Sequence, residues 1–239
     1  MYKLTTERSF RQAAKYTEGR KVKNSRRARA MEKGSRYGRK EQEGLWQNAE
    51  ATALRRLAEA GVRVPHPYNF LDGVLIMEMI DDANGNAAPR LNDLELAPET
   101  AREYYGFLIG QVVRMLCVGI VHGDLSEYNV LVDRDGPVII DLPQAVDAAG
   151  NNSAKEMLER DVDNLKNYFG QFAPELLTTD YGKEIWKVYE SCDLTPEVAL
   201  TGKFERPKST PDVRAVMREI DDVVKEEEAR RRHKAMLDS

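Results

Sequence analysis

The sequence predicts an α+β fold with a small front part of mixed strands and helix and a larger, mainly helical rear part. Residues 46–60 place apolar side chains at helical spacing, and a hairpin pattern follows up to residue 80. A long helical pattern then opens at Pro98, and a second hairpin pattern occupies 129–140. With 239 residues, 41% of them hydrophobic, the chain is long enough to bury a core in one domain or two lobes.

The predicted front part, residues 1–80, combines an amphipathic helix with a hairpin. The helix runs through WQNAEATALRRLAEA at 46–60, and Gly61 supplies a stop. Two apolar runs then flank the turn pair Asp72-Gly73, and the second run extends to Ile80. We therefore expect a small sheet packed with one helix.

The predicted rear part begins after a linker at 81–89 that is rich in Asp, Asn, Gly and Ala and shows no periodicity. Residues 90–210 form this part, and its first long helix is expected from Pro98 to about Cys117. A final charged helix is expected over 211–239. The linker is thus the predicted boundary between two lobes.

The charge of the chain is unevenly distributed. Net charge is only -4, but residues 20–40 hold ten Lys or Arg against the single acid Glu32, inside a predicted flexible loop at 19–44. Such a tract could bind phosphate backbones. A solvated loop explains the same composition equally well, and the two interpretations are left open here.

The two cysteines and the first residues bear on the cellular compartment. Cys117 and Cys192 have neither a disulfide framework nor metal-ligand spacing, and we expect two buried thiols in a reducing compartment. No apolar segment follows a basic start, and no stretch is apolar enough to cross a bilayer. These features predict a cytoplasmic protein without a membrane partner.

Three residues at the ends of the second hairpin carry the predicted chemistry. Asp124 precedes the first strand, Asn129 opens it, and Asp141 follows the second strand. Phosphoryl transfer needs cations on the phosphate oxygens and a carboxylate that orients the attacking hydroxyl, and oxygen ligands suit Mg²⁺. An aspartate before a strand is usually a turn residue when it stands alone. As a set, however, the three predict a phosphoryl-transfer site.

The motifs around these residues resemble those of the RIO family of atypical serine/threonine protein kinases. The run HGDLSEYN at 122–129 is followed by IDLPQAV at 140–146, and the resemblance extends from about Tyr2 to about Asn167. The stretch SEYN and the pair Pro143-Gln144 favour this family over other kinase-like phosphotransferases. The resemblance implies a two-lobed protein-kinase-like fold, here with a shortened N-terminal lobe and a mainly helical C-terminal lobe.

The resemblance also implies roles for the three residues. Asp124 matches the catalytic aspartate, while Asn129 and Asp141 match the residues that bind Mg²⁺ or Mn²⁺. In this family the metal-binding aspartate, here Asp141, itself becomes transiently phosphorylated, so Asp141 is counted with the catalytic residues. Turnover is then expected to resemble that of an ATPase as much as that of a substrate kinase.

Further positions follow for the nucleotide ATP. Met77-Glu78-Met79-Ile80 matches the hinge whose backbone receives adenine, so Met77, Glu78 and Ile80 are predicted cofactor-binding residues. Glu50 matches the helix glutamate that pairs with the ATP-binding lysine, and Ser126 belongs to the same cofactor-binding set. A plain buried strand and an ordinary exposed glutamate are the simpler interpretations from composition alone. His122 is expected to be structural.

The sequence departs from the family pattern at its N-terminus. Only 49 residues precede Glu50, and they contain no glycine-rich loop. Met1-Tyr2-Lys3 resembles the end of the strand that carries the family's lysine, in a register that places this lysine before Met1. A shortened sequence, a wrongly assigned start and a natural form without the glycine-rich loop and lysine strand all explain this departure. If the missing part is truly absent, ATP affinity and turnover are expected to fall.

The predicted function is ATP-dependent phosphoryl transfer by a RIO-type serine/threonine protein kinase, ATPase or both. The acceptor is expected to be a protein substrate or the chain itself. The family's association with ribosome maturation makes rRNA or a ribosomal particle the possible partner of the basic tract 20–40. A small-molecule phosphotransferase of the kinase-like fold is an alternative. A weakly active scaffold associated with RNA or the ribosome is another.

Overall fold

The computed structural model of the chain describes residues 2–3, 50–71 and 74–204. All of them except Phe204 belong to one compact unit that ends at Lys203. The beginning of the predicted first helix, the basic tract and the predicted C-terminal helix lie outside the described residues. The division into two lobes at 81–89 stays a prediction.

The front part contains a three-stranded antiparallel sheet. Its strands are β1 (Tyr2–Lys3), β2 (Pro67–Leu71) and β3 (Val74–Met77), in the order β1-β3-β2. The predicted pairing of the two strands is confirmed, but the second strand ends at Met77 and not at Ile80. The predicted turn pair Asp72-Gly73 lies outside the described residues. The Glu78 amide donates to the His66 carbonyl at 2.8 Å, and the chain leaves the sheet from there.

A helix covering residues 50–59 lies between β1 and β2 in the chain, as its spacing predicted. Its apolar face is buried, with Leu54 and Leu57 at most 2% exposed. Gly61 has φ +73°, and the Val62 amide donates to the Leu57 carbonyl at 2.9 Å. Glycine adopts this left-handed conformation without steric cost, so Gly61 ends the helix as predicted.

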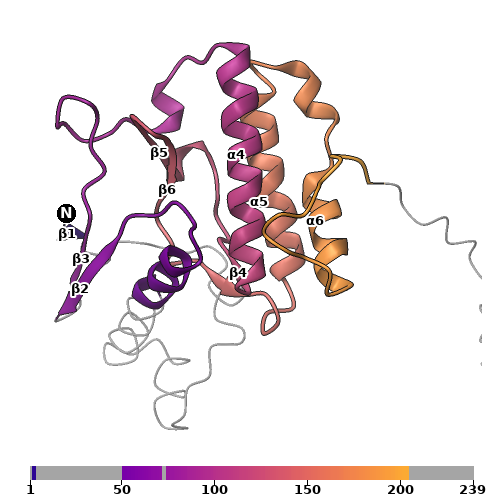
Figure 1. Cartoon of the computed structure of the whole chain (residues 1–239), viewed down its shortest axis with the longest axis horizontal. Coiled ribbons are helices and arrows are strands. Elements are labelled where there is room, and N and C mark those ends of the chain that lie inside the picture. The colour runs from indigo at the N-terminus through magenta and orange to yellow at the C-terminus, as the bar shows by residue number, and fades with distance from the viewer. Residues whose placement is uncertain (1, 4–49, 72–73, 205–239) are drawn as a thin grey trace, which may run out of the picture. The chain divides into compact units, whose positions relative to one another are not determined.

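Among the described residues of the rear part, three α-helices run alongside one another (Figure 1). They are α4 (Pro98–Cys117), α5 (Ala154–Phe169) and α6 (Tyr181–Glu190). The bounds predicted for α4 are confirmed, with proline in its first turn and Gly119 at φ +69° beyond its end. Aromatic rings fill the space between the helices, where Tyr105 of α4 contacts Phe169 of α5.

Two small strand pairs lie at the start of the rear part. One pairs β5 (Val130–Asp133) with β6 (Gly136–Ile139), which confirms the second predicted hairpin. Asn129 does not open the strand as predicted but ends a 3-10 turn, Glu127–Asn129. The other pairs β4 (Ile120–Val121) with β7 (Val146–Asp147), so the chain returns to α4 directly after the predicted site.

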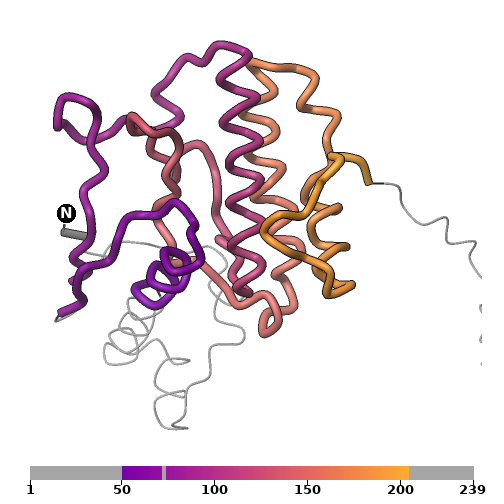
Figure 2. Tube along the Cα trace, in the orientation of Figure 1, coloured from indigo at the N-terminus to yellow at the C-terminus, as the bar shows by residue number. Residues whose placement is uncertain are grey.

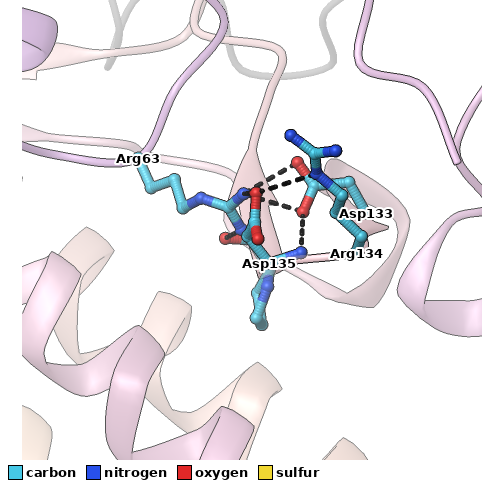
Figure 3. A network of polar contacts seen from close by, with 5 residues as sticks. Arg63, Asp133, Arg134 and Asp135 are labelled. Atoms are coloured by element: carbon cyan, nitrogen blue, oxygen red, sulfur yellow. Dashed lines mark hydrogen bonds and ion pairs between the residues drawn. The ribbon is translucent and has the colours of Figure 1, made fainter. Parts of the chain in front are cut away.

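Arg63, just after helix 50–59, is bound to the β5–β6 hairpin through a polar network (Figure 3). Its Nη2 donates to both carboxylate oxygens of Asp133 at 2.7 Å, and its Nη1 to the Pro137 carbonyl at 3.4 Å. The Arg63 guanidinium and the Asp135 amide lower the pKa of Asp133, although its partial burial acts in the opposite direction. The network fixes the segment around Arg63 to the turn of the β5–β6 hairpin.

The main chain of Arg63 adds two further links. Its amide donates to Oε1 of Gln111 on α4 at 2.8 Å, and its carbonyl accepts from the Ile139 amide at 2.9 Å. Gln111 is only 7% exposed, so this bond satisfies a polar group in the core. Arg63 thus connects the segment after helix 50–59 to both α4 and the β5–β6 hairpin.

After α6 the chain folds back along that helix (Figure 2). Both oxygens of Glu184 accept bonds from this segment: Oε1 from the Thr201 amide and hydroxyl at 2.8 Å, and Oε2 from the Gly202 amide at 2.7 Å. The prediction of two buried thiols is wrong, because Cys117 is half-buried and Cys192, in the turn after α6, is exposed. Within the described ranges, no helix is both long and apolar enough to cross a bilayer.

Candidate active site

The loop at 122–129, which carries Asp124, is held by hydrogen bonds to its main chain. The Asp124 amide donates to Nδ1 of His122 at 3.3 Å, so that nitrogen accepts and Nε2 carries the ring hydrogen. Nε2 is therefore the donor to the Ile140 carbonyl, 3.0 Å away. His122 is 2% exposed and joins the Asp124 loop to the residue before Asp141, which agrees with its expected structural role.

Helix α5 supports the same loop through Asp161. The Gly123 amide donates to Oδ2 of Asp161 at 2.7 Å, and the Leu125 amide to Oδ1 at 3.1 Å. Arg160 donates to the Gly123 carbonyl and lies 3.6 Å from Oδ1 of Asp161. Both amides that flank Asp124 are thus fixed by one carboxylate in the core.

Burial dominates the electrostatics of Asp161. Complete desolvation raises its pKa from 3.8 to about 7, although Arg160 and the two amides act in the opposite direction. The charge of nearby Asp124 adds to the increase. The loop therefore depends on a carboxyl group that changes its protonation state near neutral pH.

The predicted metal-binding residues come close together at the open end of the hairpin. The Ile140 amide donates to the Asn129 carbonyl at 2.9 Å, which places Asn129 next to the residue before Asp141. Nδ2 of Asn129 donates to the Asp124 carbonyl at 2.8 Å, so its Oδ1 is left as an oxygen ligand. Asp141 is half-buried and has φ +72°, a backbone conformation that aspartate tolerates better than most residues.

These donors fit Mg²⁺ better than a metal held by protein alone. No group of three or more His, Cys, Asp or Glu side chains in 50–71 and 74–204 could hold an ion. Magnesium is usually bound by one or two protein oxygens together with water and substrate phosphates. One amide oxygen and one carboxylate are such a set.

A residue that the sequence did not single out contacts Asp124 directly. Nε2 of Gln144 donates to Oδ2 of Asp124 at 2.8 Å. Gln144 belongs to the run IDLPQAV, where it served only to identify the family. Asp161 was also missed. Its signal was an acid on the apolar face of α5, four residues after Met157 and three after Leu158.

The predicted hinge follows β3 and is held by main-chain bonds. Met77 and Ile80 are buried, and Glu78 is exposed. The Ile80 carbonyl accepts from the Ala88 amide at 3.0 Å, and Ile80 packs with Ala88 and Val138 of β6. A small apolar cluster therefore links the hinge to the hairpin that carries the predicted metal ligands.

The other predicted site residues are placed as follows. Glu50 lies in helix 50–59 and is 3% exposed, so it is not the ordinary exposed glutamate of the simpler interpretation. Ser126 is half-buried, and its carbonyl accepts from the Asn129 amide at 3.0 Å. The pairing of Glu50 with a lysine stays a prediction. The rRNA or ribosomal partner of tract 20–40 does too, since the tract lies outside the described residues.

Comparison with known proteins identifies the family. A model of the RIO domain matches residues 3–182. The chain belongs to the RIO family. The fold implied by a RIO domain is that of protein kinases, and the mixed helices and small sheets described above agree with it.

Curated RIO proteins from archaea and eukaryotes are similar to the chain. It is 36% identical over 151 residues to the RIO-type serine/threonine-protein kinase Rio1 of Haloferax volcanii, covering 58% of this chain and 49% of that protein. The protein of the same name from Thermoplasma acidophilum is 40% identical over 125 residues, or 52% and 63% of the two chains. The human serine/threonine-protein kinase RIO1 is 32% identical over 155 residues, or 64% and 26%. The matches thus span about two thirds of these relatives or less.

Proposed function

We propose that the chain catalyses phosphoryl transfer from ATP as a RIO-type serine/threonine protein kinase. The observation that supports this most is the convergence of three polar residues at one hairpin end. The Asn129 side chain donates to the Asp124 carbonyl. The Asn129 carbonyl accepts from the amide of Ile140, which directly precedes Asp141. The similar proteins are named as RIO-type serine/threonine-protein kinases, and the motifs of this chain resemble those of that family. Both observations support the same reaction.

In this proposal Asp124 is the base that orients the acceptor hydroxyl and takes its proton. Its carboxylate is half-buried, and its main chain is fixed at both amide and carbonyl. A base held in this way needs little rearrangement when the acceptor binds. Asn129 and Asp141 would hold Mg²⁺ or Mn²⁺, which supplies positive charge to the phosphate oxygens when bound.

The hinge would bind adenine through its backbone. The Glu78 amide and the Ile80 carbonyl already bond within the protein. In the described part of the chain, the Glu78 carbonyl and the Ile80 amide have no such partner, so they are the groups that we assign to adenine. The buried side chains of Met77 and Ile80 would then contact the ring by apolar packing.

The test is ATP turnover and transfer of labelled phosphate to a generic basic protein and to the chain itself, with Mg²⁺ or Mn²⁺. We expect Asp124→Asn to abolish transfer while ATP still binds, and Asp141→Asn to abolish it with loss of metal-dependent ATP binding. Asp193→Asn, on an exposed turn, is the matched control and keeps full activity. Free phosphate without labelled protein would identify an ATPase. Turnover that survives Asp124→Asn would refute the proposal.

A further inference from the structure

We propose that Gln144 is a positioning residue that fixes the orientation of the Asp124 carboxylate. This inference rests on the proposed function, since it concerns the same reaction. Its basis is the bond of 2.8 Å from Nε2 of Gln144 to Oδ2 of Asp124, between side chains 20 positions apart. Both side chains are half-buried, so solvent competes for the bond only in part.

Two other bonds at Asp124 act on its main chain. His122 accepts from the Asp124 amide, and Asn129 donates to the Asp124 carbonyl. Neither bond restricts rotation about Cα–Cβ or Cβ–Cγ, and an aspartate side chain has several accessible rotamers. The bond from Gln144 acts on the carboxylate itself and favours one of them.

Gln144 is itself rigidly placed. It stands third in a tight turn whose first and fourth residues are joined by a bond of 3.1 Å from the Ala145 amide to the Leu142 carbonyl. Pro143 is second, where its fixed φ favours the turn, and it is buried together with Leu142. Directly after the turn, Val146 pairs with Val121, the neighbour of His122. The glutamine therefore approaches Asp124 from a stiff support.

An amide is well suited to this position. As a neutral donor it stabilises the charged carboxylate without accepting a proton at neutral pH. Gln144 also follows Asp141 by three residues, so one short segment carries both the predicted metal ligand and the group that orients the base. Placement of the metal and placement of the base are thereby coupled.

The test compares Gln144→Met, which keeps the shape and removes the donor, with Gln144→Glu, which places two carboxylates together. Loss of a hydrogen bond to a charged group should lower kcat roughly tenfold to a hundredfold in Gln144→Met, with a larger decrease in Gln144→Glu. KM for ATP should stay within about twofold, because the bond acts on the reacting geometry and not on nucleotide binding. Gln171→Met, on an exposed turn, is the control and keeps wild-type kcat.

A second measurement does not depend on turnover. In protein labelled with ¹⁵N glutamine, the side-chain amide signal of Gln144 is assigned by its loss in Gln144→Met or, if that variant does not fold, in Gln144→Asn. We expect this signal to shift in Asp124→Ala while that of Gln171 does not. An unchanged signal would overturn the inference whether or not the protein is active.

The two proposals fail in different ways. Wild-type turnover that Asp124→Asn removes and Gln144→Met leaves intact would refute the role of Gln144 and keep the proposed function. An equal rise in KM and fall in kcat would also refute it, because that result indicates a general structural role. Absence of wild-type turnover would refute the proposed function, and the amide signal would then decide the role of Gln144 alone.

Discussion

The loop at 122–129 and the hinge at 77–80 are held in opposite ways. The loop is fixed by side chains: Asp161 of α5 bonds its amides, and the ring of its own His122 bonds the Ile140 carbonyl. The hinge is fixed by main-chain bonds to its neighbours, from the Glu78 amide to His66 and from the Ala88 amide to Ile80. Substitutions should therefore damage the loop far more than the hinge.

This difference matches what each region is proposed to do. A hinge that recognises adenine by its backbone can vary in side chains and still present the same groups. A loop that presents one carboxylate at a reacting centre needs that side chain within a fraction of an ångström. The predictions below test the contrast, beginning with the largest expected effect.

Removal of the Asp161 side chain should have the largest effect. Asp161→Ala leaves the Gly123 and Leu125 amides without acceptors in the core and Arg160 beside an empty position. Each buried amide left without an acceptor costs roughly 1–3 kcal/mol, so the free energy of unfolding should fall by a few kcal/mol. Urea denaturation measures it, with Asp163→Ala on the exposed side of α5 as control. Equal stability of the two variants would contradict the assigned support.

The protonation of Asp161 predicts a pH dependence of stability. Burial raises its pKa in the folded state from 3.8 to about 7, so the folded state binds the proton more tightly than the unfolded chain. This contribution is complete below 3.8 and is lost as pH rises to about 7. The free energy of unfolding of wild type relative to Asp161→Asn should decrease across this range. A difference that rises or stays level would show that Asp161 is charged throughout.

Replacement of His122 should have a smaller effect, since Asp161 still supports the loop. His122→Phe keeps a buried ring but removes the acceptor for the Asp124 amide and the donor to Ile140. Loss of such bonds costs roughly 1–3 kcal/mol, and kcat should fall more than KM for ATP rises. Thermal unfolding and initial rates measure both. An unchanged kcat would mean that the link between the loop and Asp141 is not needed.

At the hinge, Glu78→Ala should have the smallest effect. Within the described residues, the exposed Glu78 side chain accepts one hydrogen bond, from the His66 amide at 3.0 Å. Surface substitutions of this kind usually change stability by about 0.5 kcal/mol or less, and KM for ATP should change by less than about twofold. A large rise in KM would show that the hinge uses this carboxylate and would remove the contrast between the two regions.

Local patterns were sufficient to predict much of the fold. The proline at the start of α4 and the glycine after it marked its ends. The turn composition of Asp133-Arg134-Asp135-Gly136 between two β-rich runs predicted the second hairpin. The end of β3 was misplaced because Glu78 bonds to a carbonyl outside the strand pairing, which an apolar run does not reveal. Cys192 is exposed because it lies in the turn after α6, at φ +62°.

The site was predicted only where spacing along the chain carries the information. Asp124, Asn129 and Asp141 are five and twelve positions apart around one hairpin, so their convergence follows from local structure. Asp161 reaches the loop from a helix 36 to 38 positions away, and only tertiary packing creates that contact. Gln144 is closer, but no periodicity indicates where its side chain points.

The backbone at Asp141 restricts how this site can change over generations. Its φ of +72° lies in the left-handed region, where most side chains cost roughly 1–2 kcal/mol and only glycine, asparagine and aspartate are readily accepted. A lineage released from selection for phosphoryl transfer would still be selected for folding. In such a lineage, asparagine or glycine should replace Asp141 before any other residue does. Relatives that have lost the activity would then be recognised by either of these two substitutions.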